Sequence, residues 1–193
     1  TDLRRKCVKD HVRQIVEGDA VRDWMLAECD EVVFPYDDKF KPISEDYRIP
    51  AFRFLWIGRT CLANNIMFGK KTKVESGLNW YEFGRLTSNK LRVPLSIVFS
   101  EMATHNHFVF VRGNKLFNRS APVIKLHNTA GEDDHLSLLG LLNSSTACFW
   151  LKQVCYCKGS TVDQHGARQR TDAFEDFYVF GGTTVGKFPI PSE

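Results

Sequence analysis

The stretch GLLNSSTACFWLK, residues 140–152, lies in the most helix-like apolar segment of the chain and interrupts it. Asn143, Ser144 and Ser145 occupy the middle, and these residue types end helices or cap new ones. We therefore predict a helix–turn–helix corner. Leu142 ends one helix, and Ser144 or Ser145 accepts the first free N–H groups of the next, with both apolar faces against one core. Asn143, Ser144 and Ser145 thus serve architecture in this interpretation.

Strand patterns dominate the middle of the chain. LSIVFSEM (95–102) alternates like a half-buried strand, and HFVFV (107–111) is apolar on both faces, as a central strand would be. The turn residues 112–114 followed by KLFN predict a hairpin. Three further segments complete the expected elements: a short helix in VRDWML (21–26), an amphipathic helix in AFRFLWIGRTCLANNIMFG (51–69) and a closing strand in KFPIP (187–191).

These elements predict an α+β fold with a mixed, largely antiparallel central sheet, flanking helices and the corner described above. At 193 residues and 43% hydrophobic content, we expect one domain spanning residues 1–193. We assign Trp24, Trp56 and Trp150 to the core, and Trp80 with Tyr81 to the core in preference to a stacking platform. The six cysteines fit reduced, packed thiols of a cytoplasmic protein, with no secretory signal and no membrane span.

Charge is distributed unevenly along the chain. Residues 1–47 carry net −4, residues 48–119 net +9 and residues 120–193 net −2. A basic middle between acidic flanks is typical of proteins that bind a polyanion, although a solvated surface without a partner has the same signature.

Catalytic motifs are not evident. No glycine-rich phosphate loop follows a strand, and no Gly-x-Ser-x-Gly elbow occurs. His105 and His107 alternate with Asn106 just before a strand, so both should face the same way, but no Cys, His or carboxylate has ligand spacing nearby. Cys155 and Cys157 form CxC without a second pair at zinc-finger spacing. We therefore expect no metal site and no catalytic residue in this chain.

The segment LLGLLNSSTACFWLK resembles the Leu-Leu-Asn-Ser corner of the C-terminal target-recognition domains in fused restriction–modification methylases, the TaqI-like specificity domains. Other similar pieces follow in the expected order: VEGDAVRDW, EVVFPYD, FLWIGRTCLANNIMFG, WYEFGR, LSIVFSEM, HNHFVFVRGNKLFN and KFPIP. The wording NRSAPVIKL and KGSTVDQHGARQRTDAFEDFY is most similar to adenine-specific methyltransferases of bacteriophage-exclusion (BREX, phage-growth-limitation) defence systems. The resemblance covers roughly residues 11–191.

This resemblance implies sequence-specific recognition of double-stranded DNA for an N6-adenine methyltransferase of a phage-defence or restriction–modification system. The Asn-Pro-Pro-Tyr/Phe motif of such enzymes is absent. It therefore implies that S-adenosylmethionine binds a catalytic methyltransferase domain elsewhere in a bacterial, cytoplasmic parent chain, with no cofactor in this part. Lysines and arginines would contact phosphates, and polar side chains on loops would read bases. The candidate DNA-binding residues are Arg59, Asn64, Asn65, Lys70, Lys71, Lys73, Arg85, His105, His107, Lys158, Gln164, His165, Arg168, Gln169 and Arg170.

Two alternatives remain open. The acidic flanks and many aromatic residues also suit a protein-interaction module that binds another defence component or a phage-encoded antagonist. A third hypothesis is an independent hydrolase or nuclease that uses His105 and His107. None of the three involves a membrane.

Overall fold

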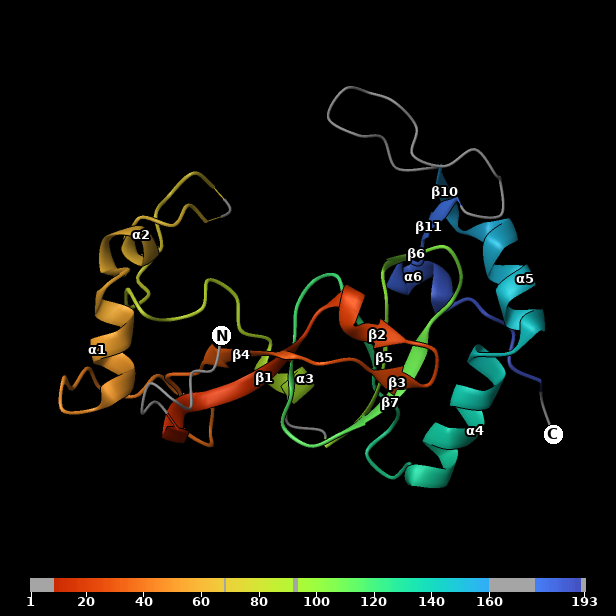
Figure 1. Ribbon diagram of the computed structural model, residues 1–193, viewed down its shortest axis with the longest axis horizontal. Coiled ribbons are helices and arrows are strands. Elements are labelled where there is room, and N and C mark those ends of the chain that lie inside the picture. Colours follow the sequence, from red (N-terminus) through yellow and green to blue (C-terminus); the bar gives the residue numbers. More distant parts are fainter. Residues whose placement is uncertain (1–8, 68, 92–93, 160–175, 192–193) are drawn as a thin grey trace. The chain divides into compact units, whose positions relative to one another are not determined.

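The computed structural model describes residues 9–67, 69–91, 94–159 and 176–191 (Figure 1). The chain divides into two compact units. The first unit comprises residues 1–14 and 30–89, and the second comprises residues 15–29 and 90–193. Each hydrophobic cluster lies within one unit, so each unit has its own core.

The first unit combines short elements with long loops. Pro50 starts its main helix, where the missing N–H costs nothing and the fixed φ suits helical backbone. Instead of one long helix after residue 50, two short helices form on either side of Gly58, a residue with low helix propensity. The elements are η2 (Lys9–His11), β4 (Asp30–Val33), α1 (Pro50–Trp56), α2 (Arg59–Ala63) and α3 (Ser88–Leu91), which crosses the boundary at residue 89.

Aromatic residues form the core of the first unit. Phe52 is fully buried, and its ring meets the edge of Tyr81 with centroids 4.9 Å apart. Trp80 and Tyr81 are each 6% exposed, which confirms their predicted place in the core. Their polar atoms are satisfied, because Trp80 Nε1 donates to Glu45 Oε2 at 3.0 Å and the Tyr81 hydroxyl donates to Ile43 O at 2.7 Å.

The largest sheet of the second unit has the order β7–β5–β9 and is antiparallel. In its centre Ile97 pairs with Phe110 on one side and with Ile124 on the other. Helix α4 packs against β5 and β7. The three strands are β5 (Leu95–Phe99), β7 (Phe108–Arg112) and β9 (Val123–Ile124).

Smaller sheets complete the second unit. β10, β11 and β6 form an antiparallel sheet, and β2 and β3 form a hairpin. β1 begins in the first unit, where it pairs with β4, and its last two residues pair in parallel with β8. The bounds are β1 (Val12–Val16), η3 (Gly18–Ala20), β2 (Val21–Arg22), β3 (Met25–Leu26), β6 (Met102–Ala103), β8 (Leu116–Phe117), β10 (Tyr156–Gly159), β11 (Phe177–Val179) and α6 (Gly182–Val185).

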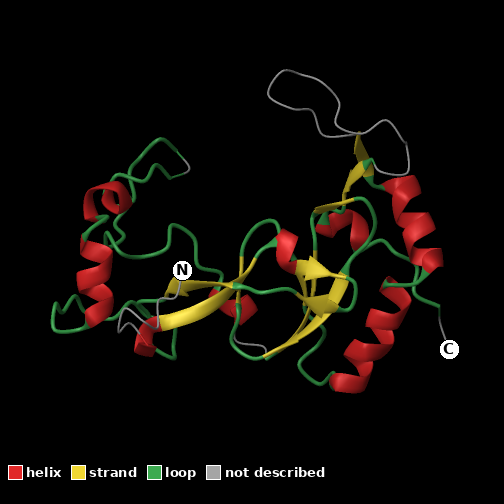
Figure 2. Cartoon of the chain, viewed as in Figure 1, coloured by secondary structure: helices red, strands yellow, loops and turns green. Residues whose placement is uncertain are grey.

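The predicted helix–turn–helix corner is present. Helix α4 (Glu132–Leu142) ends at Asn143, and α5 (Ser145–Val154) begins after Ser144 (Figure 2). Ser144 is the N-cap, since its Oγ accepts from Ala147 N at 3.1 Å. Leu139, Leu142, Ala147 and Leu151 are buried in the same cluster, so both helices share one core.

Asn143 joins this corner to the sheet. Its Oδ1 accepts from Phe108 N at 3.0 Å and its Nδ2 donates to Phe108 O at 2.8 Å. Asn106, only 5% exposed, donates to Leu142 O at 2.6 Å. The break in the apolar pattern therefore positions an amide that holds the start of β7, and its architectural role is confirmed.

The α+β prediction and its largely antiparallel strands are confirmed, with the strands divided among several small sheets. Three local predictions were wrong. Residues 21–26 form the β2–β3 hairpin, because Trp24 adopts a φ of 63° that permits a tight turn. β7 does not pair with β8, since alternation identifies strands but not their partners. KFPIP forms no strand, because its prolines have no N–H to donate.

Two tryptophans assigned to the core are at the surface instead. Trp24 lies at the hairpin turn and is 57% exposed, and Trp56 is 47% exposed. Trp150 packs at the edge of the second unit's core beside Phe188. None of the helices in the described part of the chain has the length and apolar character that crossing a membrane requires.

Candidate functional site

The loop that follows α2 presents two lysines. An antiparallel bridge between Ile66 and Thr72 closes the loop, and Met67 N donates to Lys71 O at 2.8 Å. Lys70 adopts a left-handed backbone conformation with a φ of 65°. Lys70 and Lys71 are both exposed, so the loop offers two cations to a ligand.

Lys73 differs from its two neighbours because it is only 3% exposed. Its ammonium donates to Trp80 O at 3.4 Å, and burial lowers its pKa, opposed by the charge of Glu82. Lys73 therefore supports the aromatic core of the first unit. Its position argues against the phosphate contact that the sequence suggested for it.

Arg59 is held by aromatic rings. Its guanidinium lies 4.7 Å from the centroid of Trp56 and 5.9 Å from that of Trp80. This arrangement leaves the arginine exposed while orienting it. Trp56, misplaced in the core by sequence reasoning, is thus the support of a candidate residue.

Three of the predicted residues, Asn65, Lys73 and Arg85, line one cavity of about 480 Å³ in the first unit. Glu31 and Glu82 also line this cavity, so it is not purely cationic. Asn64, Asn65 and Arg85 are exposed. The first unit therefore displays five of the predicted residues beside Arg59: Asn64, Asn65, Lys70, Lys71 and Arg85.

The basic stretch is shared between the units. Residues 48–89 have seven Lys/Arg against two Asp/Glu, and residues 90–119 have five against one. In the second unit Arg112 pairs with Glu132, with its Nε 3.1 Å from the carboxylate. Among the residues described here, Arg59, Lys70, Lys71 and Arg85 form no salt bridge.

His105 and His107 face the same way, as predicted, and their ring centroids are 4.1 Å apart. The structure brings them to Asp23, at the turn of the β2–β3 hairpin. His107 Nδ1 lies 2.7 Å from Asp23 Oδ1, and His105 Nε2 lies 3.4 Å from Asp23 Oδ2. We call these three residues the Asp-His-His cluster.

The corner of α4 and α5 helps to position this cluster. Asn106, between the two histidines, is anchored to Leu142 O, and the backbone of Phe108 is held at both N and O by Asn143. His105 Nδ1 lies 3.1 Å from Thr104 Oγ1. The histidine segment is therefore fixed on both sides of His107.

Burial and mutual contacts set the charges of the cluster. Burial lowers the pKa of His107, the charge of His105 adds to this, and the bond to Asp23 opposes it. Burial tends to raise the pKa of Asp23, but hydrogen bonds from His105 and His107 outweigh this effect and lower it. At neutral pH the cluster thus combines an ionised carboxylate with a neutral His107.

A cavity of about 540 Å³ opens beside His107. Its lining is largely polar and includes Glu17, Asp19, Arg22, Ser100 and Thr104. The backbone of Gly18 approaches Ser120 closely, because Gly18 N donates to Ser120 Oγ at 2.8 Å. A Cβ at residue 18 would lie 2.5 Å from Ser120 O, so glycine is required there.

Sequence reasoning missed Asp23, because it looked for partners of the histidines nearby in the chain. Asp23 precedes His105 by 82 residues and His107 by 84. The one signal available was its place between two short apolar stretches, which would have indicated a turn. No spacing rule links that turn to residues 105–107.

The remaining predicted residues lie at or beyond β10. Lys158 is exposed, with its Nζ 3.5 Å from Met102 Sδ. Gln164, His165, Arg168, Gln169 and Arg170 lie outside the described residues. Their proposed role in DNA contact stays a prediction.

No family model matches the chain. The whole chain is 41% identical, over 194 aligned residues, to part of a protein from Streptomyces coelicolor described as the adenine-specific methyltransferase PglX. The chain corresponds to a segment of a PglX-like protein.

This segment covers 16% of the length of the Streptomyces PglX. The similarity extends across both units, so it includes the basic loop, the Asp-His-His cluster and the corner after α4. It agrees with the methyltransferase relationship implied by the sequence motifs. Which task this part performs in PglX-like proteins is not given by the similarity itself.

Proposed function

We propose that this chain is a target-recognition domain that binds double-stranded DNA for an adenine-specific methyltransferase of a phage-defence system. Both compact units would belong to that domain. The observation that carries the proposal is the 41% identity to a methyltransferase segment, combined with unpaired exposed cations in the first unit. Catalysis would then occur elsewhere in a PglX-like protein, since the chain has no Asn-Pro-Pro-Tyr/Phe motif.

The first unit supplies two kinds of contact in this proposal. Arg59, Lys70, Lys71 and Arg85 would neutralise phosphates, because they are exposed and have no carboxylate partner among the described residues. Asn64 and Asn65, exposed next to them, have the amide donors and acceptors that can read an adenine edge. Phosphate contacts would give affinity, and the amides would contribute specificity.

Charge neutralisation has a measurable signature. Each phosphate contact contributes roughly 0.9 to the slope of log K against log salt concentration. We expect the chain to bind duplex DNA with an affinity that falls steeply with salt, and the variant Lys70→Ala/Lys71→Ala to lower the slope by about two. Fluorescence anisotropy at several salt concentrations measures both quantities.

Arg48→Ala is the matched control, because Arg48 is exposed in the same unit but pairs with Asp46 at 3.0 Å. It should change the slope less than either lysine. Salt-independent binding, or binding unchanged by loss of both lysines, would refute the proposed interface. Methyl transfer and S-adenosylmethionine binding are expected only with the catalytic part of the parent protein.

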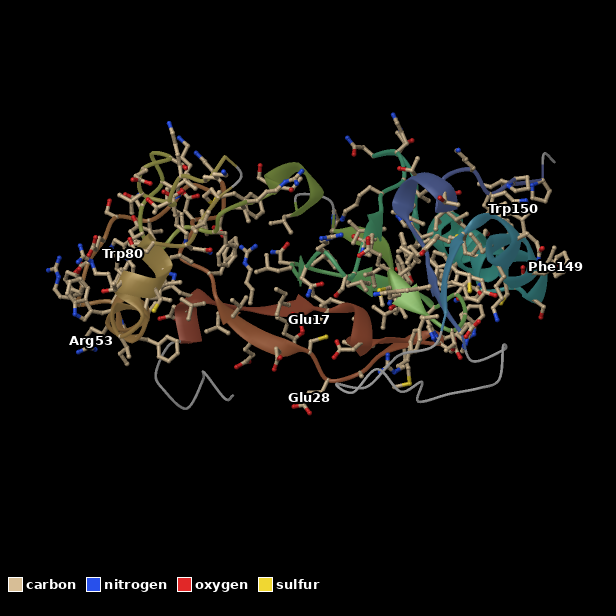
Figure 3. The ribbon with its side chains drawn as sticks, turned by 90° about the horizontal axis from the view of Figure 1, so that it is seen from above. Glu17, Glu28, Arg53, Trp80, Phe149 and Trp150 are labelled. Atoms are coloured by element: carbon tan, nitrogen blue, oxygen red, sulfur yellow. The ribbon has the colours of Figure 1, made fainter. Side chains whose placement is uncertain are left out.

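Exposed aromatic residues favour a second candidate, a protein-interaction surface. Phe149 on α5 is 70% exposed and projects from the helix (Figure 3), and Tyr156 on β10 is 72% exposed. Large exposed aromatics are common anchors in protein interfaces. If Phe149→Ala/Tyr156→Ala abolishes phage protection by the parent protein while DNA affinity is unchanged, this candidate is favoured for the second unit.

A further inference from the structure

The Asp-His-His cluster has the donor set of a transition-metal site. Two imidazoles and one carboxylate are common ligands of zinc and related divalent ions. The three donor atoms lie within 4.8 Å of one another. We propose that Asp23, His105 and His107 bind one divalent transition-metal ion.

The distances suit such an ion with a small adjustment. Bonds of 2.0–2.1 Å at tetrahedral angles place ligand atoms about 3.4 Å apart. The separation of His105 Nε2 and Asp23 Oδ2 is 3.4 Å, while that of His107 Nδ1 and Asp23 Oδ1 is 2.7 Å. Only the second pair must open, by roughly the length of a side-chain rotation at the exposed Asp23 turn.

Thr104 supports this assignment through the other nitrogen of His105. When Nδ1 carries the ring proton, it donates to Thr104 Oγ1, 3.1 Å away, and Nε2 is left with a free lone pair facing Asp23. Outer hydrogen bonds of this kind fix the tautomer and orientation of metal-binding histidines. The ionised state of Asp23 and the neutral state of His107 are also the forms that bind metals.

Three protein ligands leave at least one coordination position open, and His107 borders the 540 Å³ cavity. The open position would take water or an anionic oxygen, such as that of a phosphate, from the cavity. The ion would also join the β2–β3 hairpin to the segment before β7. This inference is independent of the DNA interface in the first unit.

The test uses the intact chain, stripped with a chelator and titrated with Zn²⁺ by calorimetry. Cys61 and Cys157 are exposed thiols that can bind zinc nonspecifically, so both are first changed to serine. We expect one ion per chain. Asp23→Asn, His105→Ala and His107→Ala should each weaken binding by more than the roughly 10–100-fold typical of removing an outer partner.

Two further variants separate a site from a general effect. Thr104→Val should weaken binding by about 10-fold, since only the tautomer support is lost. His127→Ala should have no effect, because that exposed histidine contacts Thr129 and not the cluster. Circular dichroism without metal checks that each variant is folded.

Cobalt gives a readout that does not depend on variants. Co²⁺ bound to the unchanged chain should show visible bands of nitrogen and oxygen ligation without thiolate charge transfer. Absent binding, binding lost with the cysteines, or binding unaffected by His107→Ala/Asp23→Asn would each overturn the proposal.

Discussion

The basic loop of the first unit and the Asp-His-His cluster of the second are built in opposite ways. The loop is closed by the bridge between Ile66 and Thr72, six residues apart in the sequence, and its side chains point to solvent. The cluster joins residues more than 80 positions apart and depends on Asn143, in yet another segment. Local structure is enough to display charges, whereas converging donor atoms require the whole fold of a unit.

This comparison first predicts that each unit depends on its own core. Phe52 is fully buried in the first unit, so Phe52→Ala should cost about 3–5 kcal/mol of that unit's stability. Hydrogen exchange should then rise across residues 30–89 while β5 and β7 stay protected. Phe149→Ala, at a 70% exposed position, is the control and should change stability little. Equal loss of protection in both units would contradict separate cores.

A second prediction concerns the corner that supports the cluster. Asn143→Ala removes both bonds to the backbone of the buried Phe108, which should cost about 2–4 kcal/mol because each buried group left unpaired costs about 1–3. Urea denaturation of the second unit measures this loss. Ser144→Ala removes only an N-cap and should cost about 1 kcal/mol. If the two variants were equally stable, Asn143 would be no more than a helix terminus.

Several parts of this architecture could be predicted from the sequence. Local chemistry determined the Asn143–Ser144 break and the strands at residues 95–99 and 108–112, because caps and alternation act over a few residues. The same reasoning found Arg59, Lys70 and Lys71, since charge and exposure go together.

Long-range geometry could not be predicted. The parallel pairing of β8 with β1 and the approach of Asp23 to the histidines depend on which segments meet, which no local pattern records. Lys73 shows the same limit within three residues, since sequence alone did not distinguish it from the exposed Lys70. Its burial follows from the fold around Trp80.

A third prediction tests what holds the loops of the first unit. The hydroxyl of Tyr36 accepts from Phe83 N at 2.6 Å, two residues before Arg85. Tyr36→Phe should cost about 1 kcal/mol, the net value of one hydrogen bond. Burial raises the pKa of Tyr36 to about 12, so the folded state retains this proton above pH 10 while the unfolded state loses it.

The sign of the pH effect follows directly. Between pH 10 and 12 the folded protein binds more protons than the unfolded chain, and ionisation of the unfolded state makes folding less favourable as pH rises. Stability should therefore fall across this window, and Tyr36→Phe should reduce the fall. Denaturation at a series of pH values checks this. A variant with an unchanged pH profile would show that Tyr36 is not responsible.

The smallest expected effect separates exposed from buried lysines in one loop. Lys71→Met removes an exposed cation and should lower the salt slope of DNA binding by about one, a three- to fourfold difference between roughly 50 and 200 mM salt. Lys73→Met should leave the slope unchanged, because Lys73 is 3% exposed and methionine keeps a similar length and apolar stem. The two substitutions are chemically identical and two residues apart. A slope lowered equally by both would mean that Lys73 reaches phosphate in the complex, and the loop would then have to open around Trp80 on binding.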